Sequence, residues 1–241
     1  MKLLTKLKEN LEFDPPWWSI FFHTSYFARL GLIREIKIFA PQLKGKLLDF
    51  GCGAKPYRKL FSTKEYIGVD IQKSGHNHVS SKIDVFYDGN NIPFKNSFFD
   101  SVFASEVFEH IPNLSNILSE LNRVLKIGGK LLVTVPFAIH EHETPYDFTR
   151  YTSFGIKDIL EKNGFRVLHI KKTNNYVESI FQLIVWYNTS IFLSKHKILT
   201  LLQIILFVTP FNITGTILSN ILPNKRGYYN NLVVLAYKDS E

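Results

Sequence analysis

The chain has 241 residues, 45% of them hydrophobic, and a formal net charge of +8 at pH 7. This size predicts a single domain with one sizeable core and room for an appendage. The charge favours anionic partners such as a membrane surface or a phosphorylated substrate, but the basic residues are scattered and form no tract that would bind nucleic acid. A single cysteine, Cys52, excludes an intramolecular disulfide and favours a reducing compartment.

The N-terminal stretch MKLLTKLKENLEFD mixes charges throughout and lacks the apolar core of a signal peptide. We therefore expect a cytoplasmic protein, with peripheral contact to the inner face of a membrane left open. Residues 1–43 are predicted to form a helical cap, because Leu32, Ile33 and Ile36 recur at helical spacing and Pro41 ends the pattern.

Beyond residue 43, strand-like and helix-like segments alternate. The strands are predicted in KLLDFGCG, YIGVDI, KIDVFYDG, FFDSVFAS, KLLVTVPF, RVLHIKK and LVVLAYK. A helix from Leu114 is expected to stop at Gly128 and Gly129, and a second, SFGIKDILEKNGF, at Gly164. Such alternation predicts an α/β fold with a Rossmann-like, doubly wound, mainly parallel sheet, formed by residues 44–175 and 226–241.

Residues 176–225 are predicted to form an apolar helical insertion before the last strand. The stretch from Ile198 to Asn224 carries no charge. Pro210 and several polar residues interrupt it, so that each apolar run falls short of the roughly 20 residues that a membrane span needs. We expect two apolar helices that either lie in a membrane interface, with Lys195 and Lys197 at lipid phosphates, or pack on the cap and on a second subunit.

The segment LLDFGCGAKPY places two glycines, Gly51 and Gly53, directly after the first predicted strand, where the backbone can approach a ligand. A helix beginning near Pro56 would direct free amides at a negative group. A dinucleotide fingerprint needs a glycine at position 56, which argues against a nicotinamide cofactor. Asp70 ends the second strand, where a carboxylate can accept from both hydroxyls of a ribose, and Asp88, at the end of the third, could accept from an adenine amino group.

With these residues the sequence resembles the class I S-adenosylmethionine-dependent methyltransferases, in particular their small-molecule group. LLDFGCGAKPY is similar to their first motif, YIGVD to their acidic second motif, DGNNIPFKNSFFDSVFASEVFEHIPN to the stretch over the third and fourth strands, and LNRVLKIGGKLLVTVPF to the helix, turn and fifth strand that follow. PWWSIFF, YFARLGL and HETPYDFTRYT resemble a bacterial branch found with surface-polysaccharide or lipid-linked sugar genes. Lys55 stands where many members carry a third glycine.

The resemblance implies S-adenosylmethionine as cofactor and a seven-stranded sheet whose last strand is antiparallel. It also implies cofactor contacts: Asp49, Gly51 and Gly53 at the methionine end, Asp70 at the ribose, Asp88 with Gly89 at the adenine, Ile92 and Phe94 near the adenine face, and Ser105 and Glu106 at the far wall. Each residue also has a purely structural interpretation, because tight turns recruit the same residue types.

The segment HEHETPYDFTR, residues 140–150, follows the fifth predicted strand. His142 is a candidate general base for a hydroxyl acceptor, with Asp147 or Glu143 to orient it and Arg150 to hold an acceptor carboxylate or phosphate. Alternatively, Asp147 and Arg150 form a local ion pair that shapes the loop.

Other histidines near this segment are expected to play lesser roles. His140 is expected to be solvated. His110 is expected to cap or buttress the helix after the fourth strand. Two histidines two residues apart, with no further ligand in view, are weak evidence for a metal, so none is expected.

The predicted function is methylation of an oxygen, in a sugar of a surface glycan or of its lipid-linked precursor. A methyltransferase for a quinone, a lipid or a small metabolite is the alternative enzyme, and a non-catalytic cofactor-binding scaffold at a membrane is the alternative from another class. Nucleic-acid methylation is disfavoured because the chain lacks a basic stripe with interleaved aromatics, and SEVF stands where amino-methylating enzymes carry an aromatic-proline tetrapeptide. The acceptor and the oligomeric state are left open.

Overall fold

The computed structural model describes residues 11–72, 82–192 and 197–239. The chain divides into two compact units. One, here called the helical unit, comprises residues 1–34 and 172–231, and the other, the sheet unit, comprises residues 35–171 and 232–241.

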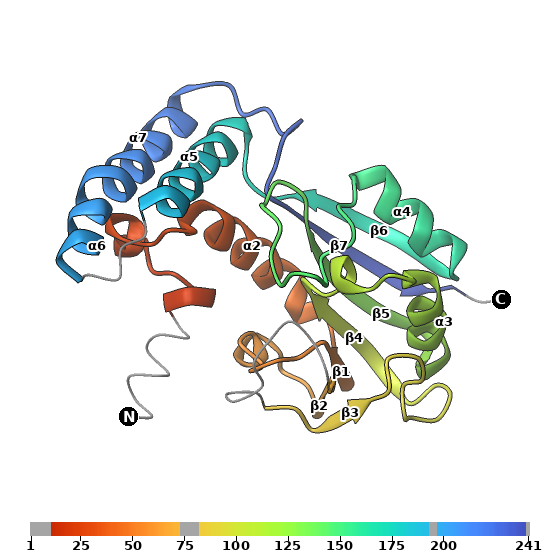
Figure 1. Ribbon diagram of the computed structural model, residues 1–241. Coiled ribbons are helices and arrows are strands. Elements are labelled where there is room, and N and C mark those ends of the chain that lie inside the picture. Colours follow the sequence, from red (N-terminus) through yellow and green to blue (C-terminus); the bar gives the residue numbers. More distant parts are fainter. Residues whose placement is uncertain (1–10, 73–81, 193–196, 240–241) are drawn as a thin grey trace. The chain divides into compact units, whose positions relative to one another are not determined.

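The sheet has seven strands in the order β3-β2-β1-β4-β5-β7-β6 (Figure 1). The strands are β1 (Lys46–Phe50), β2 (Glu65–Ile71), β3 (Val85–Tyr87), β4 (Phe99–Ser105), β5 (Leu125–Pro136), β6 (Phe165–Lys172) and β7 (Asn231–Lys238). All seven predicted strands are confirmed, as are the Rossmann-like fold and the antiparallel last strand.

Parallel pairing aligns the first five strands. β1 pairs with β2 and β4, β2 with β3, and β4 with β5, all in parallel. Their carboxyl ends therefore meet at one edge of the sheet, which is where such folds bind ligands. The central strands are apolar on both faces, and Leu47, Leu48, Val102 and Leu132 are fully buried, as expected for strands covered on both sides.

Two α-helices flank the sheet, α3 (Leu114–Val124) and α4 (Ser153–Lys162). In α4 the Thr152 hydroxyl accepts from the Gly155 amide at 3.0 Å, and Gly164 follows the helix at φ 79°, so the predicted stop is confirmed. The predicted stop of α3 is wrong, because that helix ends at Val124. Gly128, at φ 71°, instead lies within β5, at a break in its register with β4.

The prediction that a helix begins near Pro56 is also wrong. Residues 51–64 form turns and a single short 3-10 helix, η3 (Arg58–Leu60). Lys55 adopts φ 56°, outside the right-handed helical region, and the proline ring after it disfavours a helical residue at that position. The Arg58 guanidinium then donates to the Phe61 carbonyl at 2.9 Å and closes the turn.

The helical unit brings the predicted cap and the predicted insertion into contact. It contains η1 (Trp17–Phe21), the start of α2 (Tyr26–Phe39), α5 (Tyr176–Phe192), α6 (Lys197–Gln203), the π-helix η6 (Ile204–Val208) and α7 (Thr209–Ile221). The end of α2 and the 3-10 helix η2 (Ala40–Gln42) that follows it belong to the sheet unit. Asn212 of α7 donates to the Ile20 and His23 carbonyls at 3.0 and 3.1 Å. Gln182 of α5 donates to the Thr24 carbonyl at 2.8 Å.

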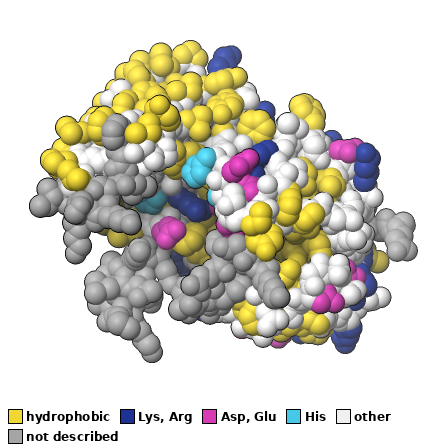
Figure 2. Space-filling view, in the orientation of Figure 1, with side chains coloured by type: hydrophobic (Ala, Val, Ile, Leu, Met, Phe, Trp, Pro, Cys, Tyr) yellow, Lys and Arg dark blue, Asp and Glu magenta, His cyan; other side chains and the backbone are white. Residues whose placement is uncertain are grey.

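The expectation that every apolar run is too short to span a membrane is wrong. Leu199–Ile221 is one continuous helical stretch of 23 residues that meets the length and composition of a span. Pro210 does not break it, because it lies in the first turn of α7, directly after the π-helix. Only 22% of its apolar window is buried, and Figure 2 shows hydrophobic side chains gathered over α5 and α7.

We expect Asn212→Ala to lower the free energy of unfolding of the helical unit by about 1–2 kcal/mol, because it removes the buried side chain that donates to two carbonyls. All three tryptophans, Trp17, Trp18 and Trp186, lie in this unit, so their fluorescence during urea unfolding reports on it. The control is Asn220→Ala in the same helix, where an exposed side chain bonds only its own helix and the change should stay within about 0.5 kcal/mol. Equal effects of the two variants would contradict the role of Asn212.

Candidate active site

The loop after β1 contains two glycines, of which one is required by packing within the protein and the other is not. Both adopt positive φ, 70° at Gly51 and 45° at Gly53. A Cβ on Gly51 would lie 2.3 Å from Val107 Cγ2, so the packing of the loop itself requires glycine there. A Cβ on Gly53 would meet no atom of the described residues within 4 Å. Among the described residues, the space beside Gly53 is therefore open to a ligand, as the glycine loop of a cofactor site requires.

Asp70, at the end of β2, holds this loop in place. Its Oδ2 accepts from the Gly53 amide at 2.9 Å, and its Oδ1 accepts from the Ile71 amide at 2.8 Å. A carboxylate oxygen can accept a second hydrogen bond, so both oxygens keep capacity for a hydroxyl. The two features that were predicted to hold the methionine end and the ribose are thus directly bonded to each other.

Asp49, the fourth residue of β1, is a buried acid. Its Oδ2 accepts from the Tyr66 hydroxyl at 2.6 Å. Burial raises the pKa of Asp49 to about 7, although the Tyr66 hydroxyl and the Lys55 ammonium act in the opposite direction. A carboxyl group with this pKa is poised to ionise when a cation binds beside it.

Lys55, the residue in place of a third glycine, makes an ion pair with Asp84. The same Asp84 carboxylate accepts from the Gly68 amide at 2.6 Å. These hydrogen bonds, together with the Lys55 charge, hold the pKa of Asp84 below its usual range despite partial burial. The lysine therefore ties the glycine loop to the segment leading into β3.

The residues predicted to hold the adenine lie at the end of β3. The exposed Asp88 carboxylate accepts from the Asn90 and Asn91 amides at 2.8 and 2.6 Å, and these bonds lower its pKa. Gly89 follows at φ 92°. Ile92 is 1% exposed and packs in the core, with its amide donating to Glu120 Oε2 at 2.9 Å. The adenine contacts stay a prediction, because the turn by itself accounts for Asp88.

Ser105 and Glu106 lie at the end of β4, as predicted. The Ser105 and Thr134 hydroxyls are 2.8 Å apart, and the Glu106 amide donates to the Thr134 carbonyl at 2.9 Å. Glu106 adopts φ 54°, which turns the chain sharply away from the strand. Both residues belong to the same sheet edge as Gly53 and Asp70.

The structure brings the three predicted catalytic residues together in the loop after β5. Arg150 pairs with both oxygens of Asp147, which lowers the Asp147 pKa to about 2. His142 Nδ1 lies 3.3 Å from Asp147 Oδ2, and the His142 amide donates to the same oxygen at 3.0 Å. Asp147 therefore orients His142, as proposed for a base. The Arg150 guanidinium is engaged by Asp147, which is the local ion pair left open as the alternative, while its role toward an acceptor stays a prediction.

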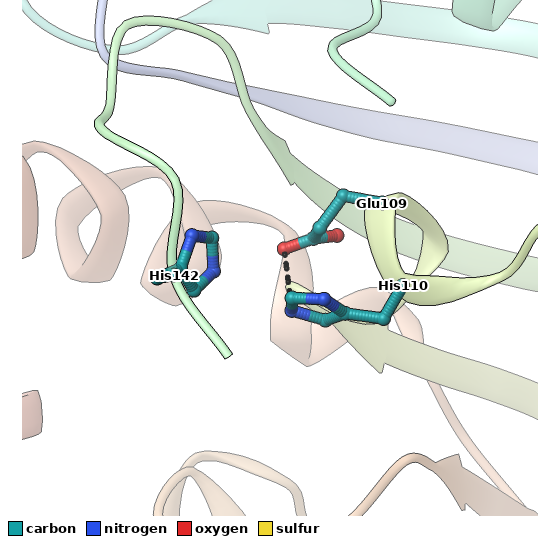
Figure 3. Close-up of side chains that lie close together, drawn as sticks. All are labelled: Glu109, His110 and His142. Carbon is teal, nitrogen blue, oxygen red and sulfur yellow. Dashed lines mark ion pairs between the residues drawn. The ribbon is translucent and has the colours of Figure 1, made fainter. Parts of the chain in front are cut away.

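Two further residues, Glu109 and His110 of 3-10 helix η5 (Phe108–His110), face this loop (Figure 3). The prediction that His110 caps or buttresses the next helix is wrong. Its Nδ1 lies 2.9 Å from the Tyr146 carbonyl, and its ring stacks edge-on with His142 at 4.9 Å between centroids. The Glu109 carbonyl accepts from the Phe148 amide at 2.9 Å.

Burial raises the pKa of Glu109 well above its usual range, and the neighbouring Glu106 carboxylate adds to this effect. The adjacent pair Glu109-His110 directly after a strand end was visible in the sequence. Its proximity to His142 was not, because the two segments are separated by α3 and β5.

Comparison with known proteins agrees with the geometry of this sheet edge. Residues 24–170, more than half of the chain, match the family model of a methyltransferase domain. A sterol 24-C-methyltransferase of Gibberella zeae is 35% identical over 101 residues, covering 35% of this chain and 26% of that protein. The chain spans less than half the length of the curated relatives that it matches first.

Solved structures share the fold at low sequence identity. The structure of phosphoethanolamine N-methyltransferase 2 from Haemonchus contortus with S-adenosylmethionine gives a TM-score of 0.56 at 18% identity, covering 98% of this chain and 57% of that one. The 4+2 cyclase SpnF gives a TM-score of 0.59 at 15% identity, covering 90% and 84%. Since a cyclase shares it, the fold alone does not define the reaction.

The seven-stranded Rossmann-like sheet with an antiparallel last strand is that of the class I S-adenosylmethionine-dependent methyltransferases. The chain belongs to the methyltransferase domain family. S-Adenosylmethionine is the cofactor of this class, and the residues present fit it, with open space at Gly53, an acceptor at Asp70 and a buried acid at Asp49.

We expect cofactor affinity to rise with pH between pH 5 and 7, approaching about tenfold per unit, and then to level off. The Asp49 pKa is about 7 in the unliganded protein, so most Asp49 is protonated below that pH, and a bound ammonium group would require it to ionise. Calorimetry over this range, in buffers of different ionisation enthalpy, measures both the affinity and the proton release. Asp49→Asn should remove the pH dependence; an unchanged slope in that variant would show that Asp49 does not face the cofactor.

Proposed function

We propose that this protein transfers the methyl group of S-adenosylmethionine to a lipid or another small apolar acceptor. The observation that carries the cofactor half of the proposal is Gly53, held in a left-handed conformation by Asp70 with open space where a side chain would stand. Nothing within the described part of the chain requires a glycine by packing at that position. The left-handed backbone favours glycine there, and the hydrogen bond to Asp70 at the carboxyl edge of the sheet supports close approach of a ligand to this loop.

The bound cofactor supplies a methyl group on a sulfonium sulfur, which is a good leaving group. The protein must then chiefly align the acceptor and exclude water. The His142 imidazole, with its Nδ1 facing Asp147, can accept the proton of a hydroxyl acceptor at its other nitrogen. Its side chain is 24% exposed, so an acceptor can reach it from the surface of the loop.

Two observations support an apolar acceptor. The sterol 24-C-methyltransferase shares 35% identity over the region it matches. In addition, the helical unit exposes large hydrophobic side chains on α6, η6 and α7, with Ile205 at 53%, Leu206 at 60% and Ile221 at 72%. The sugar acceptor expected from the sequence has no such support and stays the second candidate. A non-catalytic scaffold is the third, and an assay of methyl transfer separates it from both enzymes.

The test compares Gly53→Ala with Gly128→Ala. Both glycines adopt positive φ, 45° and 71°, and a Cβ at either meets no atom of the described residues within 4 Å. The strain of each substitution should therefore be similar, about 1 kcal/mol. Gly128 lies near the start of β5, at the opposite edge of the sheet from Gly53. We expect Gly53→Ala to weaken calorimetric binding of S-adenosylmethionine at least tenfold and to lower transfer of a labelled methyl group, and Gly128→Ala to change neither.

The acceptor is read from the same reaction run with a cell extract, by separating organic-soluble from water-soluble label. Label in the organic phase supports a lipid acceptor, and label in a water-soluble glycan would restore the sugar. Cofactor binding without transfer to any fraction would favour the scaffold. No binding by the folded wild-type protein would contradict the cofactor site itself.

We also propose that the helical unit contacts an anionic membrane. The chain has no acidic residue from Ser179 to Lys238, whereas Lys195, Lys197, Lys225 and Arg226 flank the apolar stretch 198–224. Exposed apolar side chains between basic ends match the interface of a bilayer with anionic headgroups.

We expect the wild-type protein to float with liposomes that contain anionic lipid at low salt. Leu206→Asp should reduce this binding, because it places a charge on the exposed apolar face. Ile127→Asp, at a residue 68% exposed in the sheet unit, is the control and should float like the wild type. Protein that stays at the bottom of the gradient, or equal loss in both variants, would count against the membrane surface.

A further inference from the structure

Three side chains from two separate segments converge beside the loop after β5. Glu109 and His110 come from η5, and His142 comes from the loop 140–150 (Figure 3). Each offers a ligand atom within 4.8 Å of those of the other two. The Glu109 side chain is fully buried, and neither of its oxygens has a hydrogen-bond partner within the described parts of the chain. The nearest partner shown is His110 Nε2, 3.6 Å from Oε1.

The hydrogen bonds of both histidines leave the same ring nitrogen available. His110 Nδ1 lies 2.9 Å from the Tyr146 carbonyl, which can only accept, so Nδ1 carries a proton and the lone pair of the neutral ring is on Nε2. Nε2 of His110 is buried and without a hydrogen-bond partner among the described residues. His142 Nδ1 faces Asp147 Oδ2 at 3.3 Å and the His140 carbonyl at 3.4 Å, which again leaves Nε2. A backbone carbonyl or a carboxylate behind each ring is how metal-binding histidines are commonly oriented.

We propose that Glu109, His110 and His142 bind a divalent transition-metal ion. A buried carboxylate without a partner is costly, and a cation removes that cost. The local charges fit this assignment. Asp147 is paired with Arg150, whereas Glu109 would ionise on binding and give the ion a negative charge, and Glu143 Oε1 lies 3.5 Å from His110 Nε2.

The donor set limits the choice of ion. Two imidazoles and one carboxylate suit Mn²⁺, Fe²⁺, Co²⁺ or Zn²⁺, while Mg²⁺ and Ca²⁺ prefer oxygen ligands alone. Neighbouring ligands about 2.1 Å from an ion lie about 3.0–3.4 Å apart in octahedral or tetrahedral geometry. Ligand atoms that lie within 4.8 Å of one another would therefore approach by up to about 1.5 Å on binding. Side-chain rotations of His110 and His142, which are 14% and 24% exposed, would accomplish this.

The site would act on the acceptor, an inference that rests on the proposed function. Its residues follow β4 and β5 at the sheet edge that also carries Gly53 and Asp70. Three protein ligands leave coordination positions open, as in catalytic metal sites. A hydroxyl group of the acceptor bound there would release its proton to solvent water more readily, and its oxygen would be held in a fixed position. His142 would then be a ligand and not the base, so the two roles proposed for this residue are distinguishable.

The test measures metal binding without the cofactor, so that its outcome does not depend on methyl transfer. Chelator-treated full-length protein is titrated with Mn²⁺, Co²⁺, Zn²⁺ and Mg²⁺ by calorimetry, and the absorption spectrum of the Co²⁺ form reports nitrogen ligands. We expect one ion per chain, with the transition metals bound at least tenfold more tightly than Mg²⁺. Glu109→Gln and His142→Gln should each weaken binding at least tenfold. His140→Gln, an exposed histidine two residues from His142 whose side chain lies outside the cluster, should change it less than twofold.

Thermal unfolding provides a second measurement, because an unfolding transition also shows whether each variant is folded. The metal should raise the Tm of the wild type and of His140→Gln, but not that of Glu109→Gln. Absence of binding by folded wild-type protein, or binding that all three variants retain, would overturn the assignment. In either case, cofactor binding measured in the presence of chelator still tests the proposed function separately.

Discussion

The parallel pairing of β1 with β2 and β4 is the constraint on which the rest of the site depends. Because these strands run in the same direction, the chain leaves each of them at the same edge of the sheet. There the Asp70 carboxylate, leaving β2, bonds the amide of Gly53, leaving β1, at 2.9 Å. One hydrogen bond thereby fixes both the left-handed loop and the carboxylate beside it, and neither position would be defined without the strand pairing underneath.

Four acidic residues lie at or near this edge, and two kinds of environment determine their charge. Lys55 pairs with Asp84, and Arg150 pairs with Asp147, so these acids stay ionised. Asp49 is buried and accepts from the Tyr66 hydroxyl, and burial raises its pKa to about 7. Glu109 has no donor among the described residues, and burial raises its pKa well above its usual range. The unpaired acids are thus the ones best placed to respond to cationic ligands, Asp49 to an ammonium group and Glu109 to a metal ion.

The helical unit shows how polar residues let an apolar helix persist. Asn212 donates to two carbonyls of residues 20–23, and the side chains of Thr216 and Asn220 bond carbonyls of their own helix. These donor groups find acceptors within the helical unit, so the polar residues interrupt the apolar pattern of the sequence without interrupting the helix. The exposed apolar surface that remains is what links this unit to lipid in the proposed function.

The sequence by itself determined the seven strands, the glycine turn and the family. These depend on local patterns: apolar runs bounded by turns, glycines at positive φ and acids at strand ends. Two features were not predicted from the sequence. Turns stand after Lys55 and Pro56 where a helix was expected, and Gly128 lies inside β5. Only the tertiary structure placed Glu109 and His110 against His142, because α3 and β5 separate them along the chain and strand pairing alone brings the two loops together. A local pattern carries no information about such a contact, which is why the metal cluster appears only in the folded protein.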